Sequence, residues 1–306
     1  MARQSPLHPP TAPERNTAGR FTPFARRARQ SNRAGRTMKP GASLLILPLL
    51  CGLAAFPAES RATQTADPDP AVLVEWASGE SAERLSRSSH KADFFPLSNH
   101  FISQDNAIFC GPVSSAIVLN ALRLGRKDGL PQDRQSIAQD ELVYLPEGAN
   151  PFYGKYTPNN VLTERTKTRL EVLGKPILID GDHRSDFGLQ LRQLAQVLGS
   201  HGLEVVTRVV DENADPAAIR SEIAANLAAG GDFVLVNYAR GSLGQEGGGH
   251  ISPLGAYDES SDSFLIMDVN PNRAPWVWVE ARGLIAAMRT FDTVENRGYL
   301  LVSEGD

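Results

Sequence analysis

The chain has 306 residues, of which 41% are hydrophobic and 22% are charged, and it contains two cysteines. This apolar content excludes a chain that is disordered throughout, and so few cysteines exclude a disulfide-built scaffold or a zinc module with cysteine ligands. The formal net charge of -4 averages two unlike parts. Residues 1–39 carry nine Lys or Arg against the single acid Glu14, about +8, whereas the rest carries 22 basic and 34 acidic side chains, about -12. An acidic body argues against nucleic acid or an anionic membrane as a partner.

The first 37 residues are rich in Pro, Ser, Thr and Arg and poor in aliphatic residues. Such a segment cannot bury enough apolar surface to offset chain entropy, so we expect 1–37 to be a disordered basic leader, or not to be translated if the chain starts at Met38. The pair Arg26-Arg27 could belong to a twin-arginine signal, but it lies far upstream of the next apolar run.

Residues 38–62 are typical of a secretory signal peptide. Lys39 precedes an apolar run at about 44–56, and small residues end the segment at Ser60 and Ala62. The run is shorter than the roughly 20 apolar residues of a transmembrane helix. We therefore expect export across the inner membrane to the periplasm, cleavage after Ala62, a catalytic domain at 63–306 and no stable membrane association.

Removal of this signal would also remove one of the two cysteines. Cys51 could be a lipidation site, but the bulky Leu50 before it fits poorly with a lipoprotein signal. Without Cys51, the mature chain keeps Cys110 as its single thiol. In an oxidising compartment such a thiol cannot form an internal disulfide, so it is spare, reactive or used.

The body alternates helical and extended patterns. The segment 111–125 has apolar residues at three- and four-residue spacing, which predicts a helix with Cys110 at or just before its first turn and Pro112 at a position that helix starts tolerate. Loops with short helical turns are expected at 125–160. Further on we expect a helix within 189–202, a strand at 203–210 and a helix from Asp215 to Gly231.

The last third is rich in β-formers separated by short polar turns. We expect strands at 232–239, 250–258, 263–269, 275–280 and 297–303, interrupted by one helix at 284–292. Helices in the first half and an antiparallel sheet in the second predict an α+β fold without internal repeats.

The candidate nucleophile is Cys110, because a helix N-terminus and an imidazolium lower the pKa of a thiol and make it reactive. His250 is the best-placed partner of the six histidines, since it follows the glycine-rich stretch GSLGQEGGG and begins a strand. Asp268 ends the next strand, where an antiparallel pair can bring it beside His250. Gln104, six residues before Cys110, could supply an oxyanion donor together with the Cys110 backbone N–H.

Each of these residues also has an ordinary interpretation. A cysteine at a helix start is often a small buried hydrophobe, a histidine after glycines a loop residue, the aspartate a strand-end cap and the glutamine a solvated side chain. Their joint occurrence in the order Cys, His, Asp, which is the papain-like order, favours a cysteine acyl-transfer site.

The segments QDNAIFCGPVSSAIVLNAL and GGGHISPLGAYDESSDSFLIMDV resemble phytochelatin synthases, papain-like enzymes of the glutathione gamma-glutamylcysteinyltransferase family. The similarity extends from about Phe94 to Ser303. It implies a papain-like cysteine protease fold in which Cys110 attacks the Cys-Gly amide of glutathione. His250 would protonate the departing glycine, Asp268 would orient His250, and Gln104 would be the oxyanion donor. A gamma-glutamylcysteinyl thioester would remain on Cys110, to be resolved by water or by a second glutathione.

The same resemblance implies substrate-binding residues. Asp292 and Arg297 match the pair that holds the gamma-glutamyl head in the family, Asn237 is a weaker match, and Gly111 belongs to the FCG motif of the nucleophile. A zwitterionic head needs one carboxylate and one guanidinium, so the chemistry agrees. The alternative for Asp292 and Arg297 is a solvated surface pair.

The chain departs from the family in three places. A basic residue that usually follows the catalytic Asp is replaced by Asn270, with Arg273 displaced, which puts contacts to the second substrate in doubt. Residues 126–155 are longer and less similar, and the Cys-rich C-terminal half of plant enzymes is expected to be absent. We therefore expect mainly hydrolysis to gamma-Glu-Cys, with transpeptidation to short phytochelatins as a lesser activity.

No cofactor or metal is expected to be bound by the chain itself. Cadmium or zinc would enter as a metal-glutathione thiolate substrate, and a homodimer is left open. Two other classes of function also remain at this stage: a papain-like peptidase acting on other peptides, and a non-catalytic envelope protein that binds thiol peptides.

Overall fold

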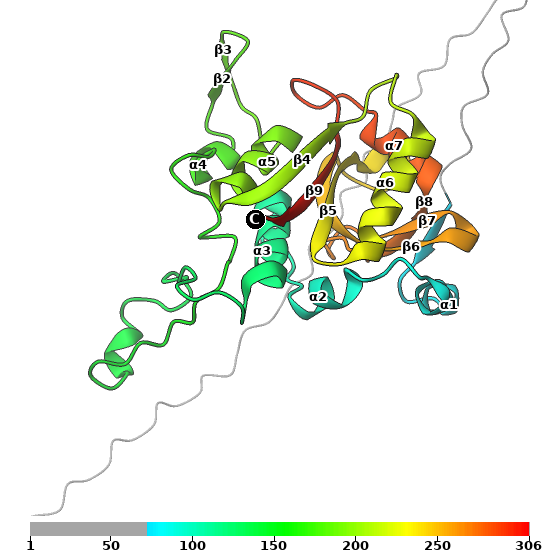
Figure 1. Ribbon diagram of the computed structural model, residues 1–306. Coiled ribbons are helices and arrows are strands. Elements are labelled where there is room, and N and C mark those ends of the chain that lie inside the picture. Colours follow the sequence, from blue (N-terminus) through cyan, green and yellow to red (C-terminus); the bar gives the residue numbers. More distant parts are fainter. Residues whose placement is uncertain (1–71, 306) are drawn as a thin grey trace, which may run out of the picture. The chain divides into compact units, whose positions relative to one another are not determined.

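The computed structural model describes residues 72–305, which fold around one antiparallel sheet (Figure 1). The predicted basic leader at 1–37, the signal peptide at 38–62 with Cys51, and Arg26-Arg27 lie outside the described residues.

The sheet has seven strands, and every neighbouring pair is antiparallel. In sheet order the strands are β1 (Leu73–Glu75), β8 (Val277–Glu280), β7 (Ser263–Ile266), β6 (Gly249–Asp258), β5 (Asp232–Ala239), β9 (Gly298–Glu304) and β4 (Leu203–Val209). The predicted α+β class is confirmed, as are the six strands expected from Leu203 onward. Two strands are shorter than expected by more than one residue: β7 ends at Ile266, two residues before Asp268, and β8 begins at Val277 rather than at residue 275.

Helices cover both faces of this sheet (Figure 1). Alternate residues of β5 point to opposite faces: Phe233 and Leu235 pack with α3 (Cys110–Arg123) and α5 (Leu191–Ser200), whereas Val234 and Val236 pack with α6 (Pro216–Ala229) and α7 (Ala281–Met288). A strand that is buried on both faces reads as a continuous apolar run, which is the pattern of FVLV.

The three long helices were predicted from their sequence spacing, and α3 is the most enclosed of them. All thirteen residues from Gly111 to Arg123 are buried. Helix α6 begins where expected, with the Asp215 side chain accepting a hydrogen bond from Ala217 N and with Pro216 in the first turn. Helix α7 differs from the expected 284–292: it runs from Ala281 to Met288, so Asp292 lies in a loop.

Several short elements were not predicted. They are β1, α1 (Gly79–Arg87), α2 (Phe94–Asn99), α4 (Arg169–Val172), the hairpin of β2 (Ile177–Ile179) and β3 (Asp182–Arg184), and the 3-10 turns η2 (Arg240–Leu243) and η3 (Glu259–Ser261). The hairpin turn is Asp180-Gly181, with φ of 51° and 89°. An Asp-Gly pair suits a two-residue hairpin turn, but the strand that follows it, Asp182–Arg184, is entirely polar, so only half of the usual hairpin signal is present in the sequence.

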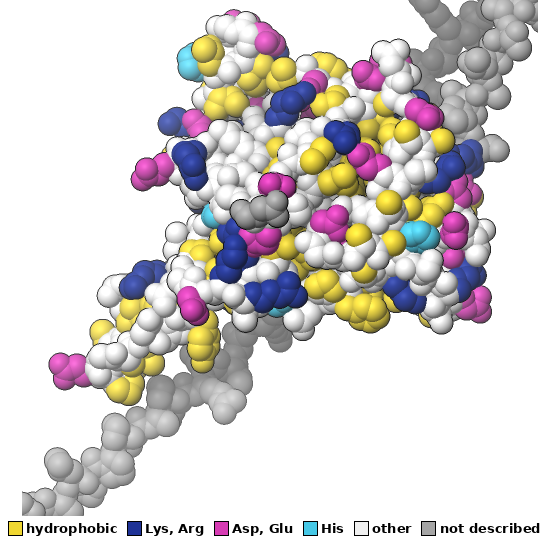
Figure 2. Space-filling view, in the orientation of Figure 1, with side chains coloured by type: hydrophobic (Ala, Val, Ile, Leu, Met, Phe, Trp, Pro, Cys, Tyr) yellow, Lys and Arg dark blue, Asp and Glu magenta, His cyan; other side chains and the backbone are white. Residues whose placement is uncertain are grey.

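The segment 125–160 is mostly loop, as expected, with one 3-10 turn, η1 (Leu142–Tyr144). It extends away from the sheet, and Figure 2 shows hydrophobic side chains on its surface. Val143, Tyr144 and Tyr153 are exposed by 74%, 88% and 87%. Across residues 72–305, no helix is both long enough and apolar enough to span a membrane.

Candidate active site

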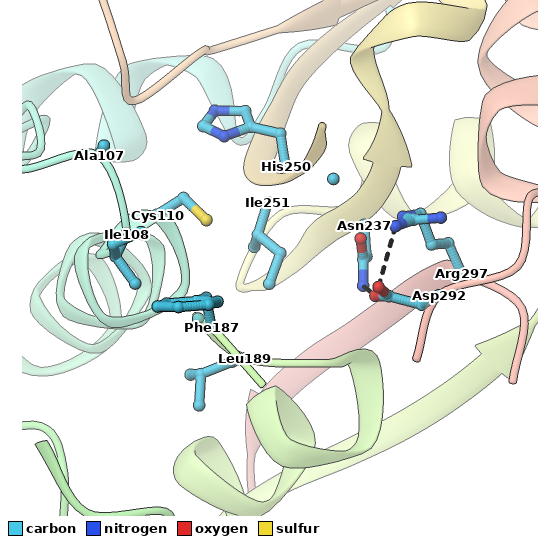
Figure 3. A pocket seen from close by; sticks show the side chains of 12 residues that line it. Ala107, Ile108, Cys110, Phe187, Leu189, Asn237, His250, Ile251, Asp292 and Arg297 are labelled. Carbon is cyan, nitrogen blue, oxygen red and sulfur yellow. Dashed lines mark hydrogen bonds and ion pairs between the residues drawn. The ribbon is translucent and has the colours of Figure 1, made fainter. Parts of the chain in front are cut away.

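Cys110 is the first residue of α3 and lies at a cavity of about 220 Å³. The cavity is lined by residues from five separate parts of the chain: Ala107, Ile108, Cys110, Phe187, Gly188, Leu189, Asn237, Gly249, His250, Ile251, Asp292 and Arg297. Figure 3 shows the Cys110 sulfur near His250 and Ile251, with Asn237, Asp292 and Arg297 grouped on the other side. All predicted site residues except Gln104, Asp268 and Gly111 therefore line one cavity.

The environment of Cys110 favours the thiolate. Burial opposes the charged form, but the hydrogen bond and positive charge of His250, with the backbone N–H groups of Ile251 and Gly111, outweigh it and lower the pKa of the thiol. The free N–H groups of the first turn of α3 add a positive dipole end at the same place. A thiol with a lowered pKa is an activated nucleophile.

His250 lies near the start of β6, opposite Tyr238 of β5. Its Nε2 is 3.0 Å from Asp268 Oδ1, and because an ionised carboxylate only accepts, Nε2 is the donor. This leaves Nδ1 for the thiol of Cys110. Burial lowers the pKa of His250, but the hydrogen bonds and charges of Asp268 and Cys110 raise it by more, so the net shift is upward.

Asp268 is 1% exposed and follows the end of β7 by two residues. Besides His250 it accepts hydrogen bonds from Arg240 Nη2 at 2.8 Å, Tyr238 OH at 3.1 Å and the backbone N–H of Asn270 at 2.7 Å. Burial raises the pKa of this carboxyl, yet His250, Arg240 and the Asn270 amide together bring it below its usual range. The side chain that faces the imidazole is thus an ionised carboxylate.

Sequence reasoning missed Arg240 and Tyr238. Arg240 begins η2 directly after β5 and is 3% exposed, with Nη2 2.7 Å from Asp268 Oδ2. The only available signal was the polar run NYAR at the end of an apolar strand, which does not reveal a partner 28 residues further on. Arg273, the basic residue expected to be displaced, is exposed and faces Glu246 at 3.4 Å.

The opposite side of the cavity holds the predicted head-group residues. Arg297 Nη2 lies 2.9 Å from Asp292 Oδ1, and Asn237 Nδ2 donates to Asp292 Oδ2 at 3.1 Å. Arg297 is 9% exposed, so this is not a solvated surface pair, and its Nε is buried without a hydrogen-bond partner among the described residues. A Cβ on Gly249 would lie 2.8 Å from Arg297 Nη2, so the glycine makes room for the guanidinium.

Gln104 is placed less directly. It is 4% exposed, its Nε2 donates to Asn106 O at 2.6 Å, and its Oε1 has no partner among the described residues. It does not line the cavity. One amide hydrogen of Gln104 remains for another acceptor, so its oxyanion role stays a prediction. Within residues 72–305, no three His, Cys, Asp or Glu side chains converge to form a metal site.

Comparison with known proteins shows which family the chain is similar to. The family model described as phytochelatin synthase matches residues 66–142 and 151–299, leaving out part of the protruding loop. The glutathione gamma-glutamylcysteinyltransferase of Schizosaccharomyces pombe is 24% identical over 72% of this chain and 45% of its own length. Glutathione gamma-glutamylcysteinyltransferase 3 of Lotus japonicus is 27% identical over 69% of this chain and 37% of its own length.

In Arabidopsis thaliana, glutathione gamma-glutamylcysteinyltransferase 1 is 39% identical over a shorter stretch, 23% of this chain and 15% of that protein. The chain thus spans less than half the length of these curated relatives. The match of the family model extends over both the Cys110 segment and the segment that carries His250, Asp268 and Asp292. The chain belongs to the phytochelatin synthase family.

Proposed function

We propose that the protein is a cysteine acyl-transferase that cleaves the Cys-Gly amide of glutathione. The observation that carries this proposal is the joint placement of a thiol with a lowered pKa and a carboxylate–guanidinium pair in one cavity. Cys110 has a lowered thiol pKa, and Asp292 and Arg297 line the same space. The relatives' names point to the same substrate.

The acylation step follows from the arrangement of Cys110 and His250. The Cys110 thiolate attacks the carbonyl carbon of the Cys-Gly amide, and a C–S bond forms while the C=O becomes an oxyanion. The backbone N–H of Cys110 and the remaining amide hydrogen of Gln104 would stabilise that charge. The His250 imidazolium then gives its Nδ1 proton to the glycine nitrogen, the C–N bond breaks, and a gamma-glutamylcysteinyl thioester remains.

The head of the substrate would be held across the cavity. Asp292 pairs with the alpha-ammonium group, and the Arg297 guanidinium pairs with the alpha-carboxylate. The Asn237 amide holds Asp292 in place. Such a pair selects for a gamma-linked glutamate, because only that linkage leaves both alpha groups free.

Deacylation completes the cycle. His250 Nδ1 removes a proton from water, or from the amine of a second glutathione, as that nucleophile attacks the thioester carbonyl. The C–S bond then breaks, the product leaves, and the Cys110 thiolate is restored beside the imidazolium. Hydrolysis is proposed as the main outcome, because Arg273 is exposed beside Glu246 and does not line the cavity to position an acceptor. Cadmium or zinc would then act as part of a metal-glutathione thiolate substrate. We further propose that the enzyme works in the periplasm after removal of residues 1–62.

The test is to incubate the purified protein with glutathione, with and without cadmium, and to follow glycine and oligomers by mass spectrometry. We expect glycine and gamma-Glu-Cys in near-equal amounts, with few oligomers. A mostly oligomeric product would overturn the preference for hydrolysis. Glycine release that survives Cys110→Ser would overturn the mechanism.

Two controls separate the other classes of function. A general peptidase would cleave peptides without a gamma linkage and would tolerate Asp292→Asn and Arg297→Gln. A non-catalytic binding protein would leave Cys110 unreactive toward iodoacetamide at pH 6. We expect neither result, because the pKa of the Cys110 thiol is lowered and Asp292 and Arg297 line the same cavity.

A further inference from the structure

A buried ion pair lies behind the cavity and has no part in the proposed chemistry. Lys167 Nζ is 2.8 Å from Asp186 Oδ2, and the two side chains are only 4% and 3% exposed. Burying two charges costs several kcal/mol per ion unless geometry and further hydrogen bonds compensate for the loss of water. A buried ion pair of this kind need not stabilise the fold. Its role is therefore sought in the segments that its hydrogen bonds connect.

Lys167 organises the segment that forms the wall next to Cys110. Its Nζ donates to Asp186 Oδ2, to Asp186 O and to Gly188 O, so all three ammonium hydrogens have acceptors in residues 186–188. The next residue, Leu189, packs against the helix that carries the nucleophile, because a Cβ on Gly111 would lie 2.9 Å from Leu189 Cδ1. Phe187 and Leu189 line the cavity below Cys110 (Figure 3).

Asp186 connects this wall to the opposite one. Its Oδ2 serves Lys167 and the start of α5, where Gln190 and Gln193 donate at 2.9 Å and 3.1 Å. Its Oδ1 accepts from Thr293 Oγ1 at 3.0 Å. Thr293 directly follows Asp292 in the chain, the residue that pairs with Arg297. The two oxygens of one carboxylate are thus divided between the nucleophile wall and the head-group wall.

We propose that Asp186, held by Lys167, is a positioning residue that fixes the distance between Cys110 and the Asp292–Arg297 site through Thr293. The inference rests on the proposed glutathione chemistry. A substrate that is gripped at its head and attacked at a distant amide reacts only if the two sites are correctly spaced. A misplacement of about 1 Å can cost on the order of 100-fold in rate.

The decisive variant is Thr293→Val, which has nearly the same shape but lacks the hydroxyl. It breaks the link between the walls and leaves the buried ion pair intact. A change at Lys167 or Asp186 would instead leave one buried charge without its partner. We expect kcat/KM for glutathione to fall about tenfold, the range for a hydrogen bond to a charged group. Thr293→Ser keeps the hydroxyl and should restore activity to near the wild-type value.

A second measurement separates positioning from general damage. Iodoacetamide alkylates Cys110 without using the head-group site, so its rate and pH profile should be the same in Thr293→Val and in the wild type. A matched control is Thr207→Val in β4, because the Thr207 hydroxyl has no hydrogen-bond partner among the described residues. This variant should leave both glycine release and alkylation unchanged.

The outcomes are distinguishable. Wild-type glycine release by Thr293→Val would overturn the inference while the proposed function stands. A parallel loss of glycine release and alkylation would show a merely structural role and would also overturn it. If the wild-type protein releases no glycine from glutathione although Cys110 is alkylated at pH 6, the proposed function fails, and the inference fails with it.

Discussion

Two buried aspartates, Asp268 beside His250 and Asp93 before α2, differ in their hydrogen bonds and in the direction of their pKa shifts. They are 1% and 0% exposed. Asp268 accepts four hydrogen bonds, and its pKa is lowered. The donors are the side chains of Tyr238, Arg240 and His250 and the backbone N–H of Asn270. Neither carboxylate oxygen of Asp93 has a hydrogen-bond partner among the described residues, and burial, with the charge of Asp232, raises its pKa to about 8.

The difference shows that donors, rather than depth, decide whether a buried carboxyl is charged. The pKa of Asp268 is kept low by His250, Arg240 and the Asn270 amide, and the Tyr238 hydroxyl is a further hydrogen-bond donor. A neutral acid at this position would not stabilise the charge of an imidazolium that faces Cys110. Each prediction below alters one side of this comparison.

The largest effect is expected from Asp268→Asn. The amide can present a donor to His250 Nε2, which favours the wrong tautomer, so glycine release should fall by about 10³ to 10⁴. Steady-state kinetics with glutathione measure this loss, and Asp128→Asn, at an exposed position, is the control. A fall of less than tenfold would show that Asp268 does not orient His250.

Asp93→Asn should change stability rather than activity. The folded protein keeps a proton on Asp93 that the unfolded chain releases above its ordinary pKa of 3.8, so stability is lost as pH rises from there to about 8. An asparagine carries no charge at any pH, so the variant does not lose stability in this way. The free energy of unfolding of the variant minus that of the wild type should therefore rise by about 1.4 kcal/mol per pH unit between these two pKa values. Urea unfolding at pH 5 and pH 8 tests this, and an advantage that is the same at both would contradict it.

Arg240→Leu should make Asp268 resemble Asp93. Loss of the guanidinium raises the pKa of Asp268, and because the ionised form is needed, the acidic limb of kcat/KM should move upward by about one to three pH units. The comparison is with Arg273→Leu, whose profile should match that of the wild type. An unmoved acidic limb would mean that Arg240 does not set the charge of Asp268.

The smallest effect is expected from Tyr238→Phe, which removes one neutral donor. Burial and the nearby Asp268 charge keep the Tyr238 pKa well above its usual value, so the hydroxyl is a donor throughout the working range. Loss of one such bond, about 1 kcal/mol, should lower kcat about fivefold with little change in KM. Tyr153→Phe, at a position 87% exposed, should have no effect.

Much of the fold could be predicted because its elements have strong local patterns. Helix α3, helix α6 and strands β4, β5 and β6 were expected close to their observed bounds. Strand β1 was missed because three residues show no periodicity, and its place is set by pairing with β8.

The site divides in the same way. Cys110, His250 and Asp268 could be named because a thiol at a helix start, a histidine after glycines and an acid after a strand each have a local signal. The structure places His250 beside Asp268, and their catalytic roles remain predictions. Arg240 and Lys167 could not be named from the sequence. Each is a charged residue in a turn or loop, and its partner, Asp268 or Asp186, is distant in the chain and is brought near only by the tertiary fold.

The order of strands has a consequence for how the protein matures. Strand β9 lies in the sheet between β5 and β4, although it is the last strand along the chain. Its register places Gly298 beside Asn237 and so brings the preceding Arg297 to the cavity. Until residues up to Glu304 have left the ribosome, β4 cannot join the sheet and the head-group site has no guanidinium. In a nascent chain, Cys110 is therefore made long before the proposed head-group site is complete.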